Sequence, residues 1–97
     1  MEDSDIEIQV KELDDLLWRR VVNTTIFSME NVPECINCSN RYYCKPKGKI
    51  SKSEIMRSVA DILRGNKESP IVINCSGKDG RRNCPGAFEI TITTNQI

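Results

Sequence analysis

Apolar residues recur at helical spacing along the first twenty or so residues of the chain. Ser4 followed by Glu7 has the form of a capping box, in which the two side chains satisfy N–H groups at the start of a helix. The apolar positions behind it are Ile6, Val10, Leu13, Leu17 and Val21, with Leu16 and Trp18 beside them. This pattern predicts a helix over about residues 5–21. The alternation of Ile6, Ile8 and Val10 also suits a short strand.

A second helix is predicted over about residues 52–64. Ser51 and Glu54 form another capping box, and Gly65-Asn66 is a typical helix end. The apolar stripe between them consists of Ile55, Met56, Val59, Ile62 and Leu63. These residues lie three, four or seven positions apart, as one face of a helix requires.

Three segments are predicted to be strands. Residues 22–28 and 71–75 are rich in β-branched residues, and residues 86–93 alternate apolar and polar positions. Residues 34–49, in contrast, show no periodicity and contain three cysteines. The predicted fold class is therefore α+β, with two main helices packed on a small antiparallel sheet and a cysteine-rich loop.

The last two strands are expected to form a hairpin. Asp79-Gly80 is a favoured pair for the centre of a two-residue type I′ turn. That turn would place Cys75 opposite Cys84, Ile73 opposite Gly86 and Ile71 opposite Phe88. Alternation then puts these apolar side chains and both cysteines on one face. Pro85 does not fit this register easily, because it has no backbone N–H to donate and suits only an edge strand or a bulge.

A chain of 97 residues corresponds to one domain, here residues 1–97. Its formal net charge is zero, but the charges are divided along the sequence. The acidic N-terminal part, residues 1–34, carries nine acids against three bases, and the basic cysteine-containing part, residues 35–84, carries eleven bases against four acids. We expect either that the two parts pack against each other or that the basic part has an anionic partner.

The basic part combines positive charge with two adjacent aromatic residues, which is the composition of a phosphate-binding surface with stacking side chains. Nucleic acid and an acidic protein are both candidate partners. The candidate contact residues are Arg41, Tyr42, Tyr43, Lys45, Lys47, Lys49, Lys52, Lys78, Arg81 and Arg82. A helix followed by a hairpin with a basic tip also resembles, in topology, the recognition helix and wing of winged-helix DNA binders.

The five cysteines are the candidate chemistry of the chain, which has no histidine. Cys35 and Cys38 have the C-x2-C spacing of a zinc knuckle, and Cys75 and Cys84 would supply a second pair across the hairpin. Four thiolates would make a closed tetrahedral zinc site that orders the loop. Cys44 is the fifth cysteine and could replace one of the hairpin pair as a ligand.

Three other interpretations of the cysteines remain open. C-x2-C-x5-C resembles part of some iron–sulfur motifs, and Cys84-Pro85 resembles the Cys-Pro that often closes one. An electron carrier or a redox sensor is therefore the alternative to zinc. Redox chemistry at Cys35-Cys38 is disfavoured because no helical pattern follows, whereas the basic neighbours of Cys44 would favour a reactive thiolate there. Disulfides or free core thiols are the last alternative.

Several functions lack support in the sequence. Without histidine there is no Cys–His or Ser–His dyad, so we expect a non-catalytic binding or regulatory module and no small-molecule substrate. No run of about 18 apolar residues is present, so we expect no membrane span. The first residues are acidic where a secretory signal would be basic and then apolar. We therefore expect an intracellular protein, in the cytoplasm or the nucleus.

Overall fold

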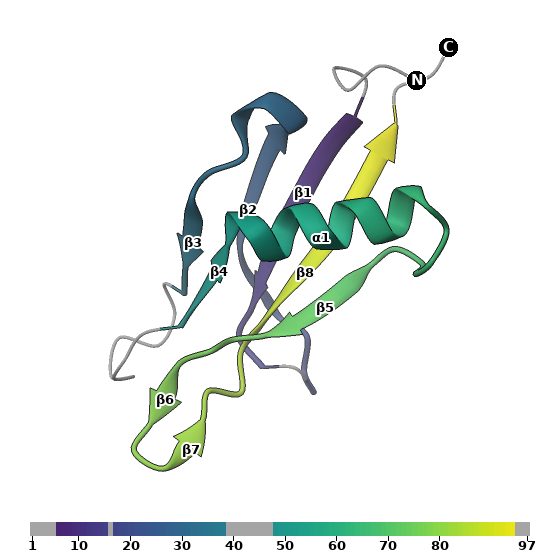
Figure 1. The fold of residues 1–97 in the computed structure, drawn as a ribbon. Coiled ribbons are helices and arrows are strands. Elements are labelled where there is room, and N and C mark those ends of the chain that lie inside the picture. The colour runs from purple at the N-terminus through teal and green to yellow at the C-terminus, as the bar shows by residue number, and fades with distance from the viewer. Residues whose placement is uncertain (1–5, 16, 39–47, 95–97) are drawn as a thin grey trace.

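The computed structural model describes residues 6–15, 17–38 and 48–94, and it is built around a four-stranded antiparallel sheet (Figure 1). The strands of this sheet are ordered β2-β1-β8-β5, so that β1 and β8 are central. Their bounds are β1 Ile6–Leu13, β2 Val21–Ser28, β5 Ile71–Asn74 and β8 Ala87–Thr94. Two small hairpins, β3 (Cys35–Asn37) with β4 (Lys49–Ser51) and β6 (Lys78–Asp79) with β7 (Arg82–Asn83), complete the strands. Met29–Asn31 forms a single 3-10 turn, η2.

The predicted helix over residues 5–21 is wrong, and with it the fold of two helices on a small sheet. Its first half is β1, which pairs with β8 along its whole length and with β2 on its other side. Its second half is the connection from β1 to β2 and the start of β2. The described part of the chain is mainly strand and has one α-helix. The resemblance to winged-helix proteins, which rests on a helix followed by a basic hairpin, stays a prediction.

The burial of this segment has the period of a strand, and a turn follows it. Ile6, Ile8 and Val10 are buried at alternate positions, as the period of two requires, and Glu12 continues the series as a buried carboxylate. Because Glu12 is polar, the strand-like alternation of apolar residues covers only three positions in the sequence. The pattern at helical spacing is longer, and it therefore led to the prediction of a helix. The side chain of Asp15 then accepts a hydrogen bond from the N–H of Leu17 (2.7 Å), which is the turn-forming contact typical of aspartate.

The single α-helix of the described ranges, α1 (Lys52–Leu63), lies across one face of the sheet and follows directly from β4 (Figure 1). Its predicted capping box is confirmed: Ser51 Oγ accepts from the N–H of Glu54 (3.2 Å), and Glu54 Oε1 accepts from the N–H of Ser51 (3.1 Å). Ile55 and Val59 are buried against the sheet residues of the core. At 12 residues α1 is too short to cross a membrane, and no other helix in the described ranges is long and apolar enough.

The core forms between α1, the inner face of the sheet and the β3–β4 hairpin. Its buried members are Ile6, Ile8, Val10, Val32, Cys38, Ile50, Ile55, Val59, Cys75, Cys84, Phe88 and Ile90. Three of these twelve residues are cysteines that the sequence singled out as candidate ligands. The cysteine site is therefore one end of the hydrophobic core, and it shares the water-excluded environment of that core.

The predicted register of the last hairpin is wrong by two residues. Ile71 pairs with Ile90, Ile73 with Phe88, and Lys78 with Asn83, so Gly80 and Arg81 are the central turn residues. Gly80 has φ +64°, and it is the only described residue of the hairpin with a positive φ. A positive φ at the first central residue alone is the requirement of a type II′ turn, which favours glycine there. Because the error is an even number, every side chain keeps its predicted face.

The tryptophan provides a test of the strand assignment. The predicted helix would place Trp18 beside an apolar stripe, whereas in the structure its side chain is 82% exposed. Because Trp18 is the only tryptophan of the chain, we expect the fluorescence emission of the native protein to resemble that of the unfolded chain. Acrylamide should quench it to a similar extent in both states. A blue-shifted, protected emission in the native state would contradict this fold.

Candidate metal centre

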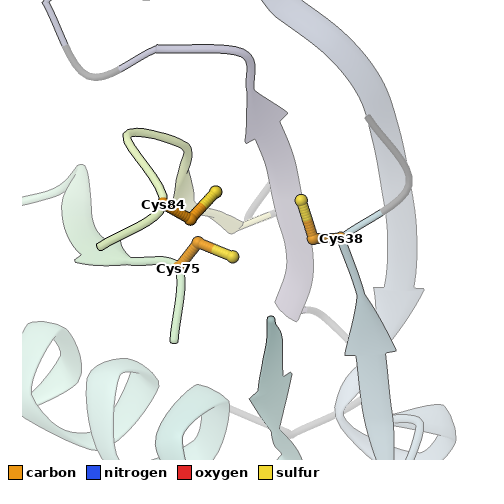
Figure 2. Close-up of side chains that lie close together, drawn as sticks. All are labelled: Cys38, Cys75 and Cys84. Atoms are coloured by element: carbon orange, nitrogen blue, oxygen red, sulfur yellow. The ribbon is translucent and has the colours of Figure 1, made fainter. Parts of the chain in front are cut away.

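Three buried cysteines converge at the end of the core (Figure 2). The Sγ atoms of Cys38, Cys75 and Cys84 lie within 4.8 Å of one another. Their side chains point toward one another, with Cys38 reaching in from the end of β3, Cys75 from the connection between β5 and β6, and Cys84 from the connection between β7 and β8. All three are at most 5% exposed, and no disulfide joins any of the four described cysteines. Segments far apart in the sequence therefore meet at these sulfur atoms.

Cys38 is positioned by the β3–β4 hairpin. In this hairpin Cys35 pairs with Ser51, and Asn37 pairs with Lys49. The pairing extends by one more residue, because the N–H of Cys38 donates to the carbonyl oxygen of Gly48 (2.8 Å). This bond sets Cys38 and Gly48 opposite each other at the end of the hairpin. Gly48 is buried, so this end of the hairpin packs into the protein.

Gly48 allows the hairpin to approach Cys75. A Cβ atom at position 48 would lie 1.8 Å from Cys75 Sγ and 2.6 Å from the backbone nitrogen of Gly77, both far inside van der Waals contact. Next to it, Ser76 Oγ accepts from the N–H of Lys49 (3.2 Å). A residue without a side chain is therefore needed for Cys38 and Cys75 to share one site.

Cys75 and Cys84 are held by a reciprocal pair of backbone hydrogen bonds. Each cysteine begins a Cys-x-Gly sequence, Cys75-Ser76-Gly77 and Cys84-Pro85-Gly86. The N–H of Cys75 donates to the carbonyl of Gly86 (3.0 Å), and the N–H of Cys84 donates to the carbonyl of Gly77 (2.9 Å). These bonds keep the register of the β5–β8 ladder up to the hairpin. Pro85 falls between the two bonded positions, where it needs no donor.

The environment disfavours a thiolate at Cys75 when no cation is present. Burial is the largest of the effects that together raise the pKa of the Cys75 thiol from 9.0 to about 12. The neighbouring Cys38 and Cys84 contribute to the rise, and a backbone hydrogen bond from Gly77 opposes it. The thiol is therefore neutral at physiological pH. A divalent cation reverses this preference, because a thiol that coordinates a metal gives up its proton.

The spacing of the three sulfur atoms suits one metal ion. Zinc–sulfur bonds are about 2.3 Å, so two sulfurs of a tetrahedral site are about 3.8 Å apart. The largest separation here is 4.8 Å or less, so small side-chain rotations would bring the three sulfurs to that distance. The cluster could hold a metal ion with three protein ligands from three buried positions.

A buried carboxylate lies beside one of the three thiols, that of Cys38. Glu12, on the inner face of β1, is 3% exposed, and its Oε2 accepts a hydrogen bond from Cys38 Sγ at 3.7 Å. The sequence interpretation did not identify this residue. The signal that could have found it is a charged residue at a core-facing position of an alternating strand, since buried polar groups are the informative exceptions.

Of the two remaining candidate ligands, the structure describes only Cys35. Cys35 begins β3 and is exposed, with its Sγ 4.0 Å from Asn37 Oδ1, so the structure does not bring it to the other three. Cys44, named as a possible substitute ligand, lies outside the described residues. The complete four-cysteine set therefore stays a prediction, and within the described ranges the cluster consists of Cys38, Cys75 and Cys84.

The predicted contact residues for nucleic acid or an acidic protein are only partly described. Arg41, Tyr42, Tyr43, Lys45 and Lys47 fall in the range 39–47, which the structure does not describe. Lys49 and Lys52 are exposed on β4 and at the start of α1, and Lys52 lies 4.0 Å from Glu34. Lys78, Arg81 and Arg82 are exposed on the β6–β7 hairpin. A binding role for these residues stays a prediction.

Gly48 is the position at which one methyl group should disrupt the site. We expect Gly48→Ala to lower the free energy of unfolding by about 3 kcal/mol, the upper end of the range for overpacking, because the added carbon meets Cys75 and the backbone at Gly77. It should also expose Cys38 and Cys75 to alkylation. Urea unfolding and mass spectrometry of alkylated peptides measure the two effects.

Gly65→Ala is the matched control for this substitution. Gly65 has φ +77°, and a Cβ atom at position 65 would meet nothing within 4 Å, so alanine there costs roughly 1–2 kcal/mol through backbone strain alone. Cys38 and Cys75 should stay protected in this variant. Equal alkylation of the cysteines in both variants would contradict the close packing of Gly48 on Cys75.

The cysteines should also differ in reactivity in the metal-free native protein. Exposed Cys35 should react with iodoacetamide at pH 7.5 faster than Cys75, which is buried and whose pKa is raised to about 12. The difference should disappear in denaturant. Peptide mass spectrometry over a time course gives the rate at each cysteine, and equal native rates would argue against a buried Cys75.

Comparisons of this chain with protein-family models, with curated proteins and with solved structures found no match to any of them. Function is therefore inferred from the chemistry of the three buried cysteines.

Proposed function

We propose that the chain is a small zinc-binding module in which the thiolates of Cys38, Cys75 and Cys84 hold one structural zinc ion. The observation that carries this proposal is the approach of three buried sulfur atoms to within 4.8 Å of one another. Zinc favours cysteine thiolates, and closed buried sites with four protein ligands are typical of structural zinc.

A structural role fits the position of the cluster in the fold. The β3–β4 hairpin and the β6–β7 hairpin are small two-stranded units outside the four-stranded sheet. An ion bound to Cys38 on one side and to Cys75 and Cys84 on the other would link both hairpins to the core. Small domains often depend on such links, because they bury little apolar surface. Structural zinc contributes about 10–16 kcal/mol of apparent binding free energy to folding.

The spacing favours a single ion over an iron–sulfur cluster. In a cluster with several irons, cysteines bind different iron atoms and are held apart by the cluster itself. The three sulfurs here are close enough to share one ion after small rotations. The iron–sulfur protein remains the second candidate, and it is distinguished by iron content and by visible absorption.

The test is the metal content of the full chain and of single cysteine variants. Protein purified without added metal should contain one zinc per chain by elemental analysis, with no visible absorption. We expect Cys38→Ser, Cys75→Ser and Cys84→Ser each to lower zinc affinity by at least tenfold, since a thiolate ligand is lost. Zinc affinity is measured by competition with a coloured chelator.

Cys35→Ser is the matched control, because Cys35 is exposed and turned away from the cluster. It should keep wild-type zinc affinity. The proposal fails if the protein binds no zinc, if it contains iron and sulfide, or if the three core cysteines can be replaced without loss of affinity.

A further inference from the structure

We infer that Glu12 supplies the fourth ligand of the proposed site, so that zinc is held by three thiolates and one carboxylate. This inference rests on the proposed zinc module and names the ligand that would complete it. It replaces the four-cysteine coordination that the sequence predicts with a mixed sulfur and oxygen set.

The carboxylate lies at a suitable separation from Cys38, and it would have to move toward Cys75 and Cys84, because the group of ligand atoms within 4.8 Å of one another contains only the three cysteines. Glu12 Oε2 lies 3.7 Å from Cys38 Sγ. With a zinc–sulfur bond of about 2.3 Å and a zinc–oxygen bond of about 2.0 Å, the sulfur and oxygen of a tetrahedral site are about 3.5 Å apart. The pair is therefore already close to the separation that a shared ion requires.

The sheet places Glu12 on the core-facing side of β1. Its backbone pairs with Phe88 of β8 on one side and with Asn23 of β2 on the other. Alternation along β1 directs its side chain to the same face as Ile8 and Val10, which are at most 2% exposed. Glu12 itself is only 3% exposed, so its carboxylate faces the core and not the solvent.

An ion could take the place of the hydrogen atom between Cys38 and Glu12. In the metal-free protein the Cys38 thiol donates that hydrogen to Glu12 Oε2 over 3.7 Å. A cation between the same sulfur and oxygen atoms would attract both of them. Three thiolates and one carboxylate carry the same total charge as four thiolates, so the electrostatics of a structural zinc site are preserved.

X-ray absorption at the zinc edge tests this ligand set directly. In the zinc-loaded full chain we expect three sulfur neighbours at about 2.3 Å and one oxygen neighbour at about 2.0 Å. Four sulfur neighbours would overturn the inference and point to a fourth cysteine, with Cys44→Ser then reducing the sulfur count. A chain that binds no zinc would overturn the proposed function instead, so the two failures are distinguishable.

A pair of glutamate variants separates Glu12 from a bound water molecule, which would also give one oxygen neighbour. Glu12→Gln keeps the shape of the side chain and removes its charge, and we expect it to weaken zinc binding by more than about 100-fold, beyond the range for residues that only orient a ligand. Glu7→Gln is the control, because Glu7 lies on the same strand but on the opposite face. Unchanged zinc affinity in Glu12→Gln would overturn the inference.

Discussion

Three thiol groups meet at one end of the hydrophobic core. Cys38, Cys75 and Cys84 lie within 4.8 Å of one another, where the end of the β3–β4 hairpin meets the two connections that join the β6–β7 hairpin to β5 and β8. Two features allow the sulfur atoms to come together. Gly48 leaves room for the side chain of Cys75. The N–H of each of Cys75 and Cys84 donates to the carbonyl of the glycine in the other Cys-x-Gly sequence. Apolar side chains could fill the same space without a glycine at position 48 and without the paired Cys-x-Gly sequences. The presence of both features around three thiols therefore favours a bound ion.

The elements with strong local signals could be predicted from the sequence, and the first element could not. The capping box at Ser51 and the apolar stripe that follows it predicted the start of α1 correctly and its end to within one residue. The β-branched segments gave β2, β5 and β8 to within one or two residues. The N-terminal segment carries apolar residues at both periods, and only its pairing between β2 and β8 decides in favour of a strand. Such long-range pairing outweighs local preference, and no single sequence reveals it.

The cysteine site shows the same division between local and long-range information. The hairpin signal placed Cys75 and Cys84 on one face, and the shift of two residues in register left that result intact. The C-x2-C spacing suggested that Cys35 and Cys38 act together, but alternation along β3 exposes Cys35, and Cys38 alone reaches the core. Glu12 interrupts the apolar alternation of β1, and its carboxylate lies beside Cys38, so a single buried polar residue bears both on the strand and on the surroundings of the cysteines.

The central claim is that one ion is bound by Cys38, Cys75 and Cys84 together. Substitution of zinc by cadmium-113 allows a correlation spectrum that connects the metal to the β protons of each cysteine that binds it. The account predicts a single cadmium signal with correlations to Cys38, Cys75 and Cys84 and none to Cys35. A spectrum without a bound cadmium signal, or one in which any of the three core cysteines is missing or Cys35 is present, would contradict it.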